Sequence, residues 1–334
     1  MALLATKAGP NNSKKTDFMS AVSPLANWIP YRLENKDEDW LLHWLYLDDK
    51  KMNDPFFDDT IRYCRAMQKR VSRFKSCSGI ALLKANEIIA LKPSAFVFHV
   101  SRCGSTLLSQ AFAQSEICIS IAEAPLLDEI LRCKEHDPSI SNAQREEWFK
   151  AALRWMGQIR TGQESSYIIK LDSWHIHFYE LLREWFPEVP FFFLTRYPGE
   201  ILASHSKIRG IHMIPGMVNP FLLKMGELPD FKGDFNAFGN DVLKHYYLEL
   251  KAILTLDCKF NRFFDYNEGA REMLESFSEF TGIELVTEMY ERLKFHSKST
   301  GRIFDTEPKA EDLSTKACRE AYQKFIDTAQ LLWD

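Results

Sequence analysis

Residues 95–107 read AFVFHVSRCGSTL: a short apolar run of β-forming residues passes directly into a glycine, serine and threonine turn that carries an arginine. This pattern predicts a buried strand that ends in an anion-binding loop at the start of a helix. The unpaired backbone amides of such a helix start point at one spot, while Gly104 permits close approach and Arg102 adds a full charge. We expect a phosphate or sulfate group to be held there by Arg102, Cys103, Gly104, Ser105, Thr106 and Leu107.

The loop does not match the Walker A pattern G-x-x-x-x-G-K-[ST], which would place glycine at position 99 and lysine at position 105. His99 and Ser105 stand at these positions. An ordinary ATPase or GTPase is therefore disfavoured. Taken alone, the loop also fits a plain strand-to-helix turn with a surface arginine, so a second site is needed to decide.

A second apolar run, PFFFL at 190–194, leads into Arg196, into Pro198 where a first helical turn tolerates proline, and into Ser204. Eight residues separate Arg196 from Ser204, a little over two helical turns, so both can face one side of the new helix and share a phosphate. Arg196 alone would be read as a solvated residue at a strand end. The pair, with the first loop upstream, predicts a second anion site.

An R-x-G-S/T-T loop after a strand, followed by an arginine with a serine eight residues later, resembles the sulfotransferase superfamily, in particular its bacterial members. The donor of that family is 3′-phosphoadenosine 5′-phosphosulfate (PAPS). The resemblance implies that the first loop holds the 5′-phosphosulfate and that Arg196 and Ser204 hold the 3′-phosphate. It also implies a three-layer α/β/α fold with a mostly parallel central sheet, similar to that of P-loop NTPases.

Two further positions extend the resemblance. Residues 167–187, YIIKLDSWHIHFYELLREWFP, are similar to the strand, lysine and helix of bacterial and tyrosylprotein sulfotransferases, which puts Lys170 in the place of the lysine near the transferred group. Glu123 follows Arg102 by 21 residues. In this it resembles the catalytic glutamate of the tyrosylprotein sulfotransferases, which lies about one loop-helix-strand unit after their loop arginine. The apolar neighbours of Glu123 predict a raised pKa suited to a general base.

Three other residues are candidates for the base. Asp172 stands two residues after Lys170, where cytosolic sulfotransferases carry a histidine, but it could instead cap the following helix. His175 and His177 come just after, and either could lie at the helix surface or be satisfied in the core. Glu123 leads, and the assignment stays open among these four.

Residues 294–304, KFHSKSTGRIF, are loosely similar to the late basic loop with which sulfotransferases close over the donor. A solvated surface turn is the alternative, because short basic loops are common at surfaces. The resemblance implies a donor-binding role for Ser297, Lys298, Thr300, Gly301 and Arg302.

Composition limits the partners. The 334-residue chain has a net charge of −4 and an isoelectric point near 6.2, so we expect no nucleic-acid partner. Seven cysteines, an odd number without C-x-x-C spacing, argue against a disulfide framework and a zinc site. No apolar run approaches a membrane span of about 18 residues, and the apolar N-terminal segment is too short for a signal peptide. We expect a cytoplasmic protein with no metal and no membrane contact.

The chain divides into a flexible tail (1–24), a partly helical extension packed on the core (25–92) and a sulfotransferase-like α/β domain (93–334). Alternating strands and helices predict a mostly parallel sheet with ligands at the carboxyl ends of its strands. The expected strands are 95–100, 117–121, 167–170, 190–195 and 260–264, the expected helices include 142–160, 235–257, 268–282 and 315–333, and 209–233 is expected to be an irregular lid.

The hypothesis is a PAPS-dependent sulfotransferase that transfers a sulfuryl group to a hydroxyl or amine of a small-molecule or peptide acceptor. Its rivals are an atypical P-loop phosphotransferase that uses ATP, and a sulfotransferase-like module that binds nucleotide without turnover. Neither the acceptor nor the oligomeric state follows from the sequence. The expected catalytic residues are Arg102, Glu123, Lys170 and Asp172.

Overall fold

The computed structural model describes residues 23–36, 39–72, 75–85, 88–227, 231–303 and 311–333, so most of the predicted tail 1–24 lies outside the described residues. At the centre is a five-stranded sheet whose strands are all parallel, in the order β5-β6-β4-β7-β8. The strands are β4 (Ala95–His99), β5 (Cys118–Ala122), β6 (Ser166–Lys170), β7 (Phe191–Thr195) and β8 (Asn261–Asp265).

Each of the five strands lies within one or two residues of its predicted range. The first four are buried at every position, as expected for parallel strands covered on both faces. Across three adjacent strands the rings of Phe98, Phe193 and Phe263 stack, with centroids 4.8 Å and 4.6 Å apart. The apolar runs that predicted strands therefore form the centre of the core.

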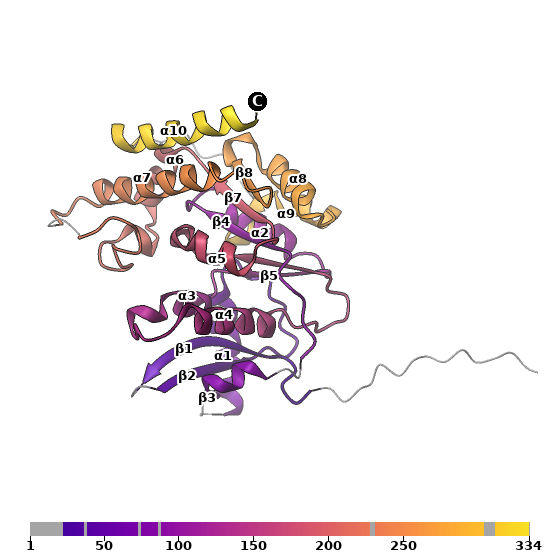
Figure 1. Cartoon of the computed structure of the whole chain (residues 1–334). Coiled ribbons are helices and arrows are strands. Elements are labelled where there is room, and N and C mark those ends of the chain that lie inside the picture. Colours follow the sequence, from indigo (N-terminus) through magenta and orange to yellow (C-terminus); the bar gives the residue numbers. More distant parts are fainter. Residues whose placement is uncertain are drawn as a thin grey trace, which may run out of the picture.

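Helices cover both faces of this sheet (Figure 1). One set packs around α2 and includes α8 and α9, and another contains α6, α7 and α10, which pack on one another. The predicted α/β class with a parallel central sheet is confirmed. The helices are α1 (Phe57–Val71), α2 (Ser105–Phe112), α3 (Pro125–Arg132), α4 (Asn142–Met156), α5 (Tyr179–Trp185), α6 (Pro198–Lys207), α7 (Phe235–Leu254), α8 (Ala270–Thr281), α9 (Thr287–Arg292) and α10 (Lys316–Trp333).

The N-terminal extension is partly helical, as predicted, and it also contains a three-stranded antiparallel sheet that was not predicted: β1 (Trp28–Lys36), β2 (Asp39–Tyr46) and β3 (Cys77–Gly79). Its tryptophans pack on α4: the ring of Trp44 lies 4.8 Å from that of Trp155. Within the residues of the extension that the structure describes, the helices are α1 and the short η1 (Ile80–Lys84).

Two later segments were expected to be loops. The lid at 209–233 is irregular apart from η4 (Ile211–Met213), although residues 228–230 lie outside the described part. The late basic loop is instead an antiparallel hairpin of β9 (Phe295–His296) and β10 (Ser299–Ile303). Among the described helices, none has the length and apolarity needed to cross a membrane.

All seven cysteines are free thiols. Cys77 on β3 is exposed and Cys258 is half-buried, whereas Cys103 and the other four are buried. The chain is thus held together by packing, with thiols mostly inside it.

Candidate active site

The predicted anion loop joins β4 to α2 and has an unusual backbone. Gly104 caps α2 with φ +81°, and the non-glycine residues Ser101 and Arg102 also have positive φ, at 71° and 52°. Such residues cost free energy and persist only where their surroundings hold them. Here the Ser101 N–H donates to Nδ1 of His99 at 3.1 Å, and the Ser101 hydroxyl lies 3.1 Å from Nε2 of His205 on α6.

Glycine is required at position 104 for a second reason. A Cβ atom added there would lie 2.2 Å from the ring of Tyr266, which follows β8 in the short helix η5 (Tyr266–Glu268). The guanidinium of Arg196 lies 5.4 Å from the same ring. Tyr266 is therefore a site residue that the sequence analysis missed; its place directly after a predicted strand was the available signal.

The rest of the loop is placed as predicted, at the start of α2. Cys103 is fully buried and its thiol donates to the carbonyl of Leu194 at 3.3 Å, so burial raises its pKa to about 12 and it acts as a small filler. Ser105 and Leu107 are buried as well. The Thr106 hydroxyl faces the centre of the site, where it accepts from the Lys170 ammonium at 3.1 Å.

The two arginine-bearing segments meet. Nη1 of Arg196 donates to the backbone carbonyl of Arg102 at 3.1 Å, while its Nε pairs with the Glu200 carboxylate at 2.9 Å. Ser204 is half-buried on α6, one residue before His205, whose ring reaches the anion loop. The structure thus brings α6 and Arg196 to the loop, with Glu200 as the present partner of Arg196.

Lys170 and Glu123 form an ion pair beside the loop. The Lys170 side chain is fully buried and its ammonium contacts Oε1 of Glu123, which also lies 3.4 Å from Nε2 of His99. The expected raised pKa of Glu123 is wrong: burial alone would raise it, but the charge of Lys170 and the hydrogen bond from His99 hold it below the usual range. Glu123 also has a positive φ, 55°, so a third strained residue lies at this site.

Asp172 has the opposite electrostatics. Its side chain is 13% exposed, and burial, with the charges of Glu123 and Asp128, puts its pKa well above the usual range. The Lys170 charge acts on it in the other direction. Asp172 is therefore the candidate base that holds a proton more tightly.

The two histidine candidates are engaged elsewhere. Nδ1 of His175 accepts from the Asp172 N–H at 3.2 Å, so its Nε2 carries the proton and donates to Asp128 at 2.9 Å. The ring of His177 packs against Tyr246 of α7, with centroids 5.5 Å apart. Of the four candidates, the two carboxylic acids are the ones beside Lys170.

One group of side chains has the composition of a metal site. Ligand atoms of Asp128, Asp172 and His175 lie within 4.8 Å of one another. The group is already linked internally, because Asp128 accepts from His175, from Nε1 of Trp174 at 2.7 Å and from Arg132 at 3.1 Å. These donors satisfy Asp128 without a cation.

The late hairpin brings a second lysine to the site. Its turn consists of Ser297 and Lys298, and the Lys298 ammonium lies 5.3 Å from the ring centroid of Phe56, a residue of the N-terminal extension. The Lys170 ammonium lies 5.2 Å from the same centroid. Desolvation of the ammonium and the charges of Arg102 and Lys170 lower the pKa of Lys298, although the residue as a whole is exposed. Thr300, Gly301 and Arg302 lie on β10, with the last two exposed.

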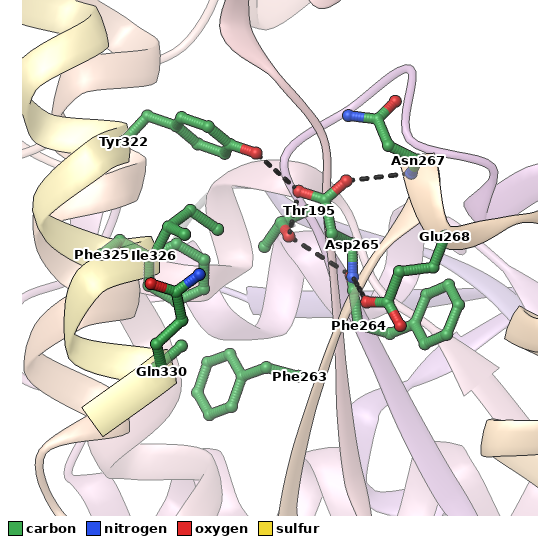
Figure 2. A pocket seen from close by; sticks show the side chains of 11 residues that line it. Thr195, Phe263, Phe264, Asp265, Asn267, Glu268, Tyr322, Phe325, Ile326 and Gln330 are labelled. Carbon is green, nitrogen blue, oxygen red and sulfur yellow. Dashed lines mark hydrogen bonds between the residues drawn. The ribbon is translucent and has the colours of Figure 1, made fainter. Parts of the chain in front are cut away.

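A cavity of about 370 Å³ lies between β8, η5 and α10 (Figure 2). Asp265 lies at its polar end and accepts from the Tyr322 hydroxyl at 2.8 Å and the Asn267 N–H at 2.9 Å. Neither Arg102 nor Arg196 lines it. The cavity is thus separate from the anion loop, although η5 borders both.

The chain thus has a parallel α/β sheet with arginine-bearing segments at the carboxyl ends of two strands. In proteins of this class, ligands bind at the carboxyl ends of the strands. No protein-family model matches the chain, and no curated protein matches it in sequence. Among the solved structures that it resembles in fold are bacterial sulfotransferases and sulfotransferase domains.

Three of them illustrate the likeness. Sulfotransferase STF9 from Mycobacterium avium has a TM-score of 0.44 and 13% identity, over 81% of this chain and 84% of that one. The sulfotransferase domain of the Synechococcus PCC 7002 olefin synthase has a TM-score of 0.41 and 14% identity, over 75% and 97%. Sulfotransferase STF1 from Mycobacterium tuberculosis H37Rv has a TM-score of 0.39 and 11% identity, over 72% and 78%.

Proposed function

We propose that the protein is a PAPS-dependent sulfotransferase that transfers a sulfuryl group to a hydroxyl or amine of a small-molecule or peptide acceptor. The observation that carries this proposal is that four cationic side chains lie near the start of α2. Lys170 donates to Thr106 of α2, and Lys298 faces the same Phe56 ring as Lys170. Arg196 donates to the backbone carbonyl of Arg102, whose own guanidinium donates to the carbonyl of Ile208 at 2.6 Å. Four cations around helix amides suit a ligand with several anionic groups, and the donor has a phosphosulfate and a 3′-phosphate.

The binding roles follow from position. Arg102 and the amides at the start of α2 would hold the 5′-phosphosulfate, and Arg196 with Ser204 would hold the 3′-phosphate. Glu200, which now pairs with Arg196, would be displaced from that guanidinium or share it. When bound, the donor supplies the sulfuryl group.

The transfer is an in-line displacement: the acceptor oxygen or nitrogen forms a bond to sulfur as the bond from sulfur to the phosphate oxygen breaks. Lys170 and Arg102 would stabilise the charge that develops on the leaving phosphate. Glu123 would take the acceptor proton, with Asp172 as the alternative. Of these groups, Glu123 already contacts the Lys170 ammonium.

The first test is a thermal-shift titration with 3′,5′-ADP, 5′-AMP, and ATP with magnesium. We expect 3′,5′-ADP to stabilise the fold, by about 2.7 kcal/mol at 100 times its Kd, and ATP with magnesium not to do so. In Arg196→Ala the preference for 3′,5′-ADP over 5′-AMP should disappear. Stabilisation by ATP with magnesium alone would favour the phosphotransferase.

The second test asks whether turnover occurs. The protein is incubated with PAPS and a metabolite or peptide extract, and mass spectrometry searches for products that have gained a sulfo group. We expect such a product, and the same yield after treatment with a chelator. Tight 3′,5′-ADP binding without product or donor hydrolysis would instead identify a non-catalytic nucleotide-binding module.

A further inference from the structure

A buried chain of polar side chains connects three segments that are distant in sequence. Gln110 on α2 is 1% exposed, and its amide nitrogen donates to the backbone carbonyl of Asn53 in the N-terminal extension at 2.8 Å. Its amide oxygen accepts from Nη2 of Arg292 on α9 at 3.4 Å. The helix that begins at the anion loop is therefore tied to the extension on one side and to α9 on the other.

Arg292 continues the chain into the late hairpin. It is 4% exposed, and its guanidinium donates to three successive carbonyls, those of Phe295, His296 and Ser297, at 3.2, 3.1 and 2.9 Å. A buried guanidinium is tolerated only where hydrogen bonds replace its water. These carbonyls fix the strand and turn that precede Lys298.

Phe56 completes the connection from the other side. It lies three residues after Asn53, and its ring faces both the Lys170 and the Lys298 ammonium groups, at 5.2 and 5.3 Å from its centroid. An aromatic face attracts a cation at this separation. A single ring of the extension thus faces both the hairpin lysine and the lysine that contacts Glu123.

On the basis of the proposed function, we propose that the extension is part of the donor site: Phe56, Gln110 and Arg292 are positioning residues. They seat the hairpin turn so that Lys298 faces the 5′-phosphate of the donor, the group that 3′,5′-ADP shares with PAPS. The turn that carries Asn53 and Phe56 lies outside every motif that resembles a sulfotransferase. The Asn53 carbonyl accepts from Gln110 of α2, and the Phe56 ring faces Lys170 and Lys298. These contacts connect the N-terminal extension to the proposed donor site.

The test uses the full chain and 3′,5′-ADP as probe. Phe56→Leu removes the ring, Phe56→Tyr keeps it, and Arg292→Lys keeps the charge but cannot reach three carbonyls. The matched control is Arg145→Lys, because Arg145 on α4 is also a buried arginine, 8% exposed, that donates to a backbone carbonyl, that of Leu131 at 3.0 Å. Isothermal titration gives the Kd, and hydrogen exchange reports the hairpin amides.

We expect Phe56→Leu and Arg292→Lys to weaken 3′,5′-ADP binding about 5- to 30-fold and to speed exchange of the amides of 295–303, with Phe56→Tyr near wild type. Arg145→Lys should lower the melting temperature without either effect. In a Lys298→Ala background, Phe56→Leu should change the Kd less.

Two outcomes would overturn the proposal, and they are distinguishable. If the wild type binds 3′,5′-ADP and both variants bind it equally well with unchanged hairpin exchange, the extension has no part in the donor site, while the sulfotransferase function stands. A wild type that does not bind 3′,5′-ADP would overturn both proposals. A variant that is unfolded is replaced by Gln110→Leu, which cuts the same chain.

Discussion

Three residues of the candidate site have a backbone conformation that their side chains disfavour. Ser101, Arg102 and Glu123 have positive φ, and each such residue costs roughly 1–3 kcal/mol. A hydrogen bond to His99 and the ion pair with Lys170 hold them in place. Strain that coincides with the predicted site supports a functional reason for it.

Arg102→Ala should lower the rate of sulfated product formation by about 10² to 10³, because one preorganised donor to the developing charge is lost. Arg102→Lys keeps a charge but lacks the planar fork, so its rate should lie between the two. The rate is measured by mass spectrometry of the product at a saturating donor concentration, chosen from the Kd for 3′,5′-ADP of each variant because Arg102 also belongs to the proposed donor site. A rate near that of the wild type in Arg102→Ala would remove this loop from the reaction.

Glu123→Gln should lower turnover by about 10² to 10⁴ with 3′,5′-ADP binding intact, and Asp172→Asn should lower it less. Since the pKa of Glu123 lies below its usual range, it stays ionised and the wild-type rate should be flat from about pH 8 to about pH 5. The pKa of Asp172 lies well above its usual range, so an Asp172 base would take up a proton as the pH is lowered. A rate that decreases as the pH is lowered from about 8 to about 5 would therefore assign the base to Asp172.

Residues next to a strand end could be predicted from the sequence, and residues that arrive from elsewhere could not. Arg102, Lys170 and Arg196 each stand at or just after a strongly apolar strand, so the rule for parallel sheets places them at one edge. Phe56 and Arg292 reach the same place through the packing of the extension and α9. No local pattern marks such contacts.

At the level of elements, the N-terminal strands show what the sequence analysis missed in the extension. The segment 25–46 mixes tryptophans with charges, and its first strand contains Pro30 and a bulge between Pro30 and Arg32. Proline and a bulge interrupt the alternation by which a strand is recognised. The segment becomes a strand because it pairs with β2, and such pairing cannot be read from the strand propensities of its residues. The five core strands needed no such partner information, because their apolar runs alone distinguish them.

The contact between α3 and β1 predicts a pH-dependent stability. Glu129 on α3 accepts from the Leu33 N–H at 2.5 Å, and burial raises its pKa from 4.5 to about 7. Between these values the unfolded carboxyl group is ionised while the folded one keeps its proton, so the free energy of unfolding decreases as pH rises.

When the pH is raised from about 5 to about 8, the free energy of unfolding should therefore decrease less in Glu129→Gln than in the wild type. The expected difference is about 1–2 kcal/mol. Urea unfolding at both pH values measures this difference. Glu180→Gln, on the exposed side of α5, is the control and should behave like the wild type. Equal pH dependence in wild type and Glu129→Gln would contradict the assignment.

At the scale of the whole molecule, the N-terminal sheet and the parallel sheet share one apolar core. Trp44 is 5% exposed, and besides its contact with Trp155 its indole N–H donates to Ser78 at 2.8 Å. We expect Trp44→Ala to cost about 3–5 kcal/mol and calorimetry to show a single transition in both proteins. Tyr63→Ala, at an exposed position of α1, is the control. Two transitions, with only one of them shifted, would make the extension a separate domain.

The distribution of thiols offers a practical handle on the extension. Of the seven cysteines, Cys77 at the edge of the N-terminal sheet is exposed, whereas Cys103 in the loop before α2 is fully buried. A maleimide dye added under native conditions should therefore attach first at Cys77 and leave the ligand pocket chemically untouched. Because the label needs no introduced cysteine, its fluorescence would then report any motion of the extension when 3′,5′-ADP is added.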